Sequence, residues 1–197
     1  MRHIRILVFV FYLCACTAVQ TQTSTPTFSA AQIDAEEQAV YAAVLGQLYS
    51  ASSFVIMDTT ATDPGGVENT EQTLDYVLQN LHDVNPKTIE NFRERNETAA
   101  PLQLDMDLGV AYTLLSQAER NNIFGQNQSG WEIFYSRYPD APGIITLSRV
   151  GFDAAFDQAL VYVGTQSDWL AGAGYYVLMK KVNGAWIVDQ KVMSWIS

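Results

Sequence analysis

The segment Tyr175–Val192 reads YYVLMKKVNGAWIVDQKV. Its Asn183-Gly184 pair stands between two apolar runs, which is the pattern of a β-hairpin with a type I′ turn. A two-residue turn there predicts three cross-strand pairs: Lys181 with Trp186, Met179 with Val188, and Val177 with Gln190. One face of the hairpin is then apolar, and we expect it to face the core. That face carries Tyr175, Val177, Met179, Trp186, Val188 and Val192.

Four consecutive strands are expected in the last third of the chain. Runs of strand-forming residues predict them at Ile144–Phe152, Ala159–Val163, Tyr175–Val182 and Trp186–Ile196. Helical spacing and capping residues predict helices at Ser29–Tyr49, Glu71–His82, from Pro86 onward, Ser116–Gly125 and Trp131–Tyr138. Short strands are expected at Phe54–Met57 and, from strict alternation with a possible break at Gly109, at Leu102–Leu114. The predicted class is α+β, with N-terminal helices and a short strand packed on a four-stranded antiparallel meander.

The first 15 residues have the three parts of an export signal. Arg2 and Arg5 precede the apolar run Ile6–Leu13, which is too short to span a bilayer. The following Leu13-Cys14-Ala15-Cys16 resembles a bacterial lipobox. That resemblance implies cleavage before Cys16 and lipidation of this residue, with palmitate-type acyl chains. An ordinary secretory signal that contains cysteine is the alternative.

The chain is therefore expected to have three parts. Residues 1–15 form the signal peptide, and residues 16–28 form the lipidated Cys16 with a flexible tether rich in Thr, Ser and Gln. Residues 29–197 form a single globular domain of a size that can bury its own core. We expect the protein to be anchored by lipid to a bacterial membrane, facing the extracytoplasmic side.

The charge of the chain argues against nucleic acid as a partner. The formal net charge is −10, and without residues 1–15 nine basic residues stand against 21 acidic ones. Such a field repels phosphate backbones. The two cysteines both lie in the export region, so the domain has no disulfide, and we expect a monomer.

No motif in the chain points to a catalytic, metal or cofactor site. His82 is the one histidine outside the export signal, and it suits the end of a helix. Val55–Ala61 is similar to the Asp-Thr-Gly loop of aspartic proteases, but no second copy follows, so Asp58 is better explained as a polar residue at a strand end. Asp105 and Asp107 begin like a calcium loop, yet their alternation with apolar residues predicts the solvent face of a strand.

Arg149 and several aromatic residues are the candidate ligand-binding groups. Arg149 is predicted inside a strand, where its charge needs a partner. The candidates for that partner are Asp153, Asp157 and Glu132, and a ligand is the alternative. A set of aromatic residues could line a groove or belong to the core: Trp131, Tyr135, Tyr138, Trp169, Tyr175 and Tyr176. From these groups we take Arg149, Asp58, Tyr138 and Trp169 as possible ligand-binding residues.

The C-terminal third contains Leu147–Phe152 (LSRVGF), Gln158–Val163 (QALVYV) and Gly172–Leu178 (GAGYYVL). It resembles an uncharacterised group of bacterial envelope lipoproteins with the ending SRVGF…ALVYV…GxGYYVLL…GxW. The resemblance implies a cysteine pair before Gly172, where this chain has Trp169-Leu170-Ala171 instead. The helix-then-meander order is also similar to cystatin-like and nuclear-transport-factor-2-like folds.

These observations predict a non-catalytic domain that binds a small molecule or a protein at the cell envelope. The alternative is an envelope hydrolase that uses carboxylates such as Asp58 together with Arg149. Convergence of Asp58, Arg149 and a further acid in one concave pocket would favour the enzyme. Their dispersal would favour the binding domain.

Overall fold

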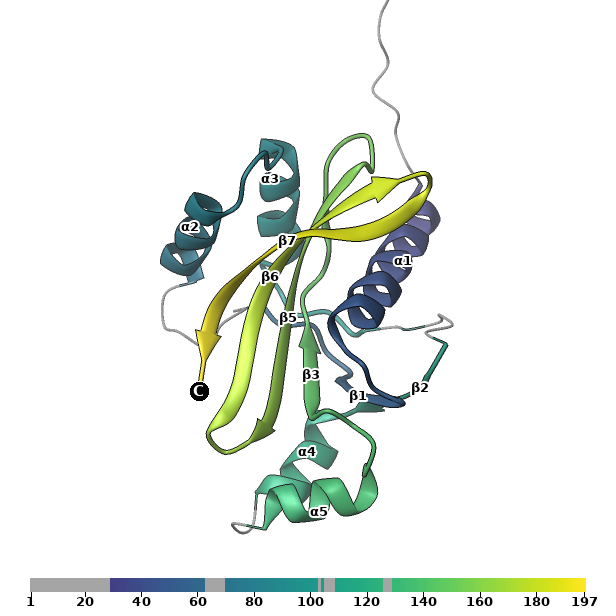
Figure 1. Cartoon of the computed structure of the whole chain (residues 1–197), viewed down its shortest axis with the longest axis vertical. Coiled ribbons are helices and arrows are strands. Elements are labelled where there is room, and N and C mark those ends of the chain that lie inside the picture. The colour runs from purple at the N-terminus through teal and green to yellow at the C-terminus, as the bar shows by residue number, and fades with distance from the viewer. Residues whose placement is uncertain (1–28, 63–69, 103, 105–108, 126–128) are drawn as a thin grey trace, which may run out of the picture.

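The computed structural model describes residues 29–62, 70–102, 104, 109–125 and 129–197, and these form an α+β fold with five helices and a mixed seven-stranded sheet (Figure 1). The predicted class is confirmed. The helices are α1 (Ala30–Leu48), α2 (Thr70–Asn80), α3 (Pro86–Arg95), α4 (Gln117–Phe124) and α5 (Gly130–Arg137). The strands are β1 (Ser53–Met57), β2 (Ala111–Leu115), β3 (Ile144–Leu147), β4 (Gly151–Phe152), β5 (Gln158–Asp168), β6 (Ala171–Val182) and β7 (Ala185–Ile196).

The export signal, Cys16, the tether, Asp105 and Asp107 lie outside the described residues. None of the described helices is long and apolar enough to cross a membrane. Of the strand expected over Leu102–Leu114, the described residues show β2, and Leu102 is not in a strand. Gly109, where a break was possible, has a φ of +68° that disfavours residues with a side chain.

The sheet has the order β2-β1-β3-β5-β6-β7, with β4 paired to β5. The pairs β3–β5, β5–β6 and β6–β7 are antiparallel, whereas β1 pairs with β2 and β3 in parallel. The sequence analysis expected the short strand β1 to pack on the antiparallel strands, and this expectation is wrong. Strand β1 extends their sheet by hydrogen bonding.

The strand predicted at Ile144–Phe152 is interrupted between β3 and β4. At this interruption the backbone N–H groups of Arg149 and Val150 donate to the side chains of Asn96 and Glu37. These two side chains, from the C-cap of α3 and from α1, take the place of hydrogen-bond partners on a neighbouring strand. The strand is therefore interrupted at these two residues. The interruption places Arg149 in a connection between two strands.

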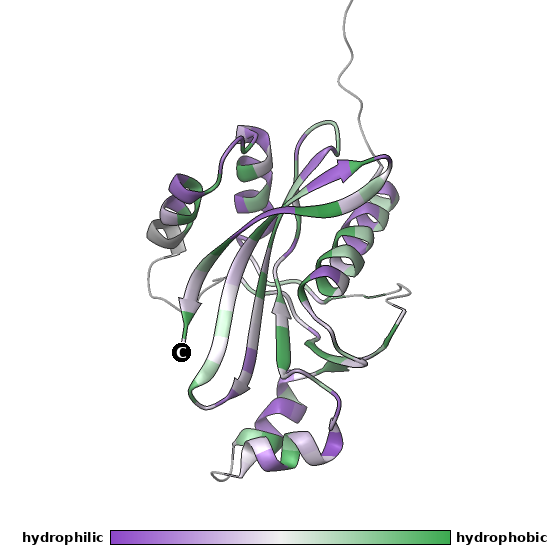
Figure 2. Cartoon of the chain, viewed as in Figure 1, coloured by the Kyte–Doolittle hydropathy of each residue, from purple (hydrophilic) through white to green (hydrophobic). Residues whose placement is uncertain are grey.

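Both faces of the sheet are covered. Figure 1 shows α1 on one side of the long strands, α2 and α3 on the other, and α4 with α5 at one end. Because side chains alternate across a strand, Val177 packs under α1 and Leu178 packs under α2 and α3. The helices in Figure 2 carry polar residues beside apolar ones, as expected for helices with one face on a core. The expectation of a single core face on the hairpin is therefore wrong.

The predicted hairpin turn is present. Asn183 and Gly184 have φ values of +51° and +82°, and both must be positive in a type I′ turn. Lys181 pairs with Trp186 and Met179 with Val188, as predicted. The third predicted pair is wrong, because Asp189 is an extra residue in β7 and Val177 pairs with Lys191.

A second extra residue, Ser194, interrupts the β7 register near its end. The shift at Asp189 also moves Val192 to the face that packs under α2 and α3, away from the face predicted for it. By contrast, Trp186 is buried on the predicted face, with 5% of its surface exposed.

The Gly172-Ala173-Gly174 motif at the start of β6 accommodates a close side-chain contact. A Cβ atom on Gly174 would lie 2.0 Å from Trp195 Nε1 and 2.6 Å from the Tyr162 hydroxyl. Trp195 Nε1 donates a 2.7 Å hydrogen bond to that hydroxyl. The glycine is thus needed for packing, as is common where another group approaches the backbone of a strand closely.

Local sequence signals set the helix ends. Ser29 and Gln32 form a complete capping box at the start of α1. Asn85 caps α3, which has Pro86 in its first turn, and Ser116 caps α4 through the Glu119 N–H. These caps fix where α1 and α3 begin, and the two helices carry the side chains of the site described next.

Candidate functional site

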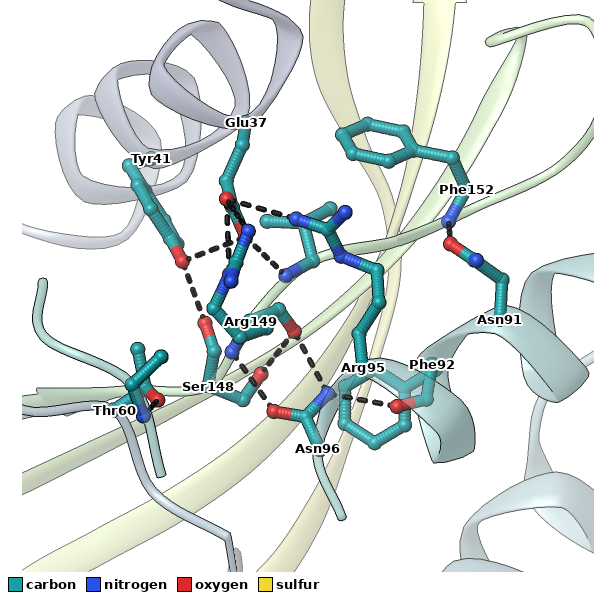
Figure 3. Close-up of polar contacts among 12 residues, drawn as sticks. Glu37, Tyr41, Thr60, Asn91, Phe92, Arg95, Asn96, Ser148, Arg149 and Phe152 are labelled. Atoms are coloured by element: carbon teal, nitrogen blue, oxygen red, sulfur yellow. Dashed lines mark hydrogen bonds and ion pairs between the residues drawn. The ribbon is translucent and has the colours of Figure 1, made fainter. Parts of the chain in front are cut away.

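Glu37 on α1 is a buried carboxylate that two arginines approach from different elements (Figure 3). Arg149 donates from Nε to both carboxylate oxygens, at 2.9 and 3.1 Å, and from Nη2 to Oε2 at 2.8 Å. Arg95 on α3 donates from Nη2 to the same Oε2 at 2.9 Å. The Val150 N–H donates to Oε1 at 2.8 Å, and the Tyr41 hydroxyl is shared between Oε1 at 3.1 Å and the Ser148 carbonyl at 2.8 Å. The carboxylate is therefore fully surrounded by donors.

These donors decide the protonation of Glu37. Burial alone would raise the pKa of Glu37, but the hydrogen bond from Arg149, the charge of Arg95 and the Val150 N–H outweigh it. The pKa of Glu37 is consequently lowered, and the group stays ionised at neutral pH. Burial, together with the Glu37 charge, raises the pKa of Tyr41 well above its usual value, so its hydroxyl remains a donor.

Asn96, the C-cap residue of α3, holds the connection that carries Arg149. Its side-chain oxygen accepts from the Arg149 N–H at 2.8 Å, and its amide donates to the Arg149 carbonyl at 3.0 Å. The same amide donates to the carbonyl of Phe92 at 2.8 Å. The backbone of Arg149 is thus fixed to α3 while its side chain is fixed to α1.

The partner of Arg149 differs from the sequence prediction. None of Asp153, Asp157 and Glu132 pairs with it, and Glu37 takes that place. Glu37 was missed by the sequence analysis. It lies on the buried stripe of α1, four residues after Ile33 and four before Tyr41. A charged residue on an apolar stripe was the available signal, because such a group must be paired when it is buried.

Arg149 lines a groove of about 520 Å³ beside α1. The groove is bounded by α1 and by the segment before Leu102, and its lining is Asp34, Ala35, Glu37, Gln38, Tyr41, Ala100, Pro101, Leu102 and Arg149. The Arg149 side chain is 26% exposed, whereas its partner Glu37 is nearly covered, at 7%. The groove therefore presents the guanidinium to solvent and keeps the carboxylate behind it.

A second cavity of about 350 Å³ lies beside Arg95, between α1, α3 and the residues after Phe152. The side chain of Arg95 is 16% exposed, and its Nε is buried without a hydrogen-bond partner among the described residues. Three acids, Glu90, Glu94 and Asp153, also line this cavity, together with Lys87. The three negative charges exceed the two positive charges of Lys87 and Arg95, so this cavity is less suited to an anion than the groove at Arg149.

The other predicted ligand-binding residues do not join Arg149. The Asp58 carboxylate accepts a 2.9 Å hydrogen bond from the neighbouring Thr59 hydroxyl, although the Asp58 carbonyl accepts from the N–H of groove residue Leu102. Tyr138 packs on Phe134 in the apolar cluster of α4 and α5.

Trp169 is half exposed at the turn between β5 and β6, and its ring edge contacts Phe124 of α4. His82 follows α2, where its backbone exchanges two hydrogen bonds with the Gln190 side chain. Cys16 lies outside the described residues. Within the described part of the chain, no three His, Cys, Asp or Glu side chains form a group that could hold a metal ion.

No known protein family, no curated protein and no solved structure matches this chain. The function is therefore argued from the groove and from the charges that line it.

Proposed function

We propose that this chain is a non-catalytic binding domain, anchored by a lipid on Cys16 and displayed outside the cytoplasm. Its ligand site is the groove between α1 and the segment before Leu102, with Arg149 as the anion-binding group. The expected cystatin-like or nuclear-transport-factor-2-like arrangement of four antiparallel strands remains a proposal about the fold. The succession β3, β5, β6 and β7 is compatible with it.

The single observation that supports this function is the composition of the charge cluster. Two arginines share one buried carboxylate, so the cluster of Glu37, Arg95 and Arg149 carries a net charge of +1. Glu37 uses Nε and one Nη2 hydrogen of Arg149, and Nη1 has no hydrogen-bond partner among the described residues. A guanidinium held in this way is oriented before a ligand arrives, which lowers the ordering cost of binding.

The hydrolase alternative has less support. A carboxylate enzyme would bring Asp58 and a further acid together with Arg149 in one pocket. Instead, Arg149 is committed to Glu37, whose lowered pKa makes it a poor proton donor. The Asp58 carboxylate is not part of the groove lining. The separation of these groups supports a site that binds and does not react.

Titration with acetate tests this proposal. The full chain with Cys16→Ser, which cannot be lipidated, would be labelled with 15N and titrated with acetate while amide shifts are recorded. We expect saturable shifts at Ala35, Gln38 and Leu102, which line the groove. Unchanged amides at these positions in concentrated acetate would contradict the proposal.

A matched pair of variants at Ala35 connects any binding to the groove. Ala35 is exposed on α1 and lines the groove without contacting the Glu37 cluster through hydrogen bonds. Ala35→Glu adds a negative charge and should weaken acetate binding about fivefold or more. Ala35→Gln has nearly the same size and no charge, so it should leave the affinity within about twofold. Equal weakening by both variants would indicate crowding and not charge.

A further inference from the structure

We propose that the ligand of this groove is a zwitterion, with its carboxylate on Arg149 and its ammonium group on Asp34. This inference rests on the proposed function, because it assigns the chemistry of the same groove. The shared feature of such ligands is one carboxylate and one ammonium group. A free amino acid and a short peptide both have it.

The carboxylate half of the site is the open edge of Arg149. A guanidinium has five N–H donors in a planar fork, and a carboxylate can bind two of them at once. The inner edge of Arg149, Nε with Nη2, is occupied by Glu37. The outer edge, Nη1 with the second hydrogen of Nη2, is left for a ligand in the groove.

The ammonium half of the site is Asp34. Asp34 lies three residues before Glu37 on α1, so the two side chains share one side of the helix. It is exposed and lines the groove, and its side chain forms no hydrogen bond or ion pair with the described residues. Its charge acts on Arg149, whose pKa is raised mainly by the hydrogen bond to Glu37 and to a smaller extent by Asp34. The Asp34 carboxylate and the open edge of Arg149 therefore lie in one electrostatic environment, and the Asp34 side chain is available to a ligand cation.

The charges of the groove explain why a zwitterion fits better than a simple ion. Glu37 and Asp34 together balance Arg95 and Arg149, so the surroundings of the groove are neutral overall. An anion at Arg149 is repelled by Asp34, and a cation at Asp34 is repelled by Arg149. A ligand that carries both charges makes two attractive contacts and avoids both penalties.

The remaining walls of the groove limit the size of the ligand. Ala35, Ala100, Pro101 and Leu102 are small or apolar, and Gln38 and Tyr41 complete the lining. Ala100 is fixed by its N–H, which donates to the Thr60 hydroxyl, and Leu102 is fixed by its N–H, which donates to the Asp58 carbonyl. A volume of about 520 Å³ accepts an amino acid with a short side chain or a peptide of a few residues. The walls offer apolar contact to such a side chain.

Four probes separate the possibilities in the same amide-shift titration: alanine, acetate, ethylammonium and trialanine. We expect alanine or trialanine to bind about tenfold more tightly than acetate or ethylammonium, since each simple ion makes one of the two charge contacts. A preference for alanine identifies a free amino acid, and a preference for trialanine identifies a peptide. Equal affinities for alanine, trialanine and acetate would overturn the inference.

Asp34→Asn tests the ammonium half without touching the arginine cluster. It should bring the affinity for the zwitterion down to that for acetate, and it should strengthen acetate binding because a repulsive charge is removed. Asp140→Asn is the matched control, since Asp140 is an exposed aspartate in the turn after α5. An Asp34→Asn variant that binds alanine as wild type would overturn the inference.

The two proposals fail in different ways. If acetate shifts the groove amides and the zwitterions bind no better, the zwitterion assignment is wrong and the binding groove stands. If none of the four probes shifts these amides, the binding function itself is wrong, and the inference falls with it.

Discussion

Arg149 Nη2 lies 2.8 Å from Glu37 Oε2, and this contact joins two residues that stand 112 positions apart in the chain. The helix that carries Glu37 is the first described element, whereas Arg149 lies in the connection between β3 and β4, which both pair with β5. The ion pair thus connects this helix to the antiparallel part of the sheet. Arg95 adds a third attachment from α3, so three separate segments depend on one carboxylate.

Glu37→Gln should destabilise the protein strongly. The substitution leaves two arginines, both largely buried, without a counter-charge, and breaking a buried pair in this way costs about 3–5 kcal/mol. Urea unfolding would measure the change. Glu90→Gln is the control, because Glu90 forms an exposed ion pair with Lys87 that should contribute little to stability. Similar costs for the two variants would contradict the structural role of Glu37.

The same carboxylate predicts a loss of stability in acid. The pKa of Glu37 is lowered in the folded protein, below its unfolded-state value of about 4.3. The ionised group therefore contributes stability above that pH, and the contribution is lost as the pH falls through the folded-state pKa. Unfolding free energies of wild type and Glu37→Gln should differ at pH 6 and approach each other near pH 3. A gap that does not change with pH would refute this assignment.

Gly174→Ala should disrupt the packing between β6 and β7. The added Cβ would lie 2.0 Å from Trp195 Nε1, so the indole would have to move and its hydrogen bond to Tyr162 would be lost. We expect a cost of roughly 2–4 kcal/mol in denaturant unfolding, with a change in tryptophan fluorescence. Gly46→Ala is the control in α1, where a Cβ meets no atom within 4 Å, and it should stabilise by up to about 1 kcal/mol. A neutral Gly174→Ala would show that this contact is not tight.

Trp186→Ala should cost about 3–5 kcal/mol, because the side chain is buried under α1 and its removal leaves a cavity. The loss also removes the 2.8 Å hydrogen bond from Trp186 Nε1 to Glu36 and the position of Lys181 over the ring. Thermal and urea unfolding would both report it. Ile187→Ala is the control, because the neighbouring Ile187 is 40% exposed, and it should lower the unfolding free energy far less. If the two costs were reversed, the assignment of the hairpin faces would be wrong.

Cys16→Ser should abolish lipidation and leave the precursor uncleaved at this position. The thiol of Cys16 is the expected acceptor of the lipid, and a hydroxyl does not replace it in this reaction. Metabolic labelling with a radioactive fatty acid would detect the modification in wild type and its absence in the variant. Cys14→Ser is the matched control and should remain labelled. Wild-type protein that is released without label would refute the proposed anchor.

The local elements were predictable because their signals are local. The capping box of Ser29 and the apolar spacing after it give α1 to within one residue at each end. The Asn183-Gly184 turn gives the hairpin and its first two pairs. Each of these features depends on residues a few positions apart, which a single sequence contains in full.

The remaining features depend on partners that are distant in sequence. The break between β3 and β4 exists because the side chains of Asn96 and Glu37 accept hydrogen bonds from the backbone there. The residues next to Arg149 in the sequence carry no signal that predicts it. The extra residue Asp189 likewise has no distinctive neighbours. The burial of both sheet faces could have been inferred, since the run from Tyr175 to Met179 is apolar without alternation.

The candidate site was predictable in part. Arg149 was identified as a charge in need of a partner, but a partner 112 residues away cannot be chosen from spacing alone. Tyr138 and Trp169 were grouped with it because aromatic residues suit both cores and binding sites. Their place near α4 and α5 depends on the whole fold.

The outer strand of the sheet has a consequence for contacts between copies of the protein. β7 is the last strand of the sheet order, yet extra residues at Asp189 and Ser194 interrupt the even spacing of its backbone groups. Near the hairpin turn, the Gln47 side chain already bonds the carbonyl of Trp186 and the N–H of Val188. A strand from a neighbouring molecule would find no continuous template along this edge. If the proposed lipid anchor holds copies of the protein on one membrane surface, their sheet edges could therefore meet without forming a shared sheet.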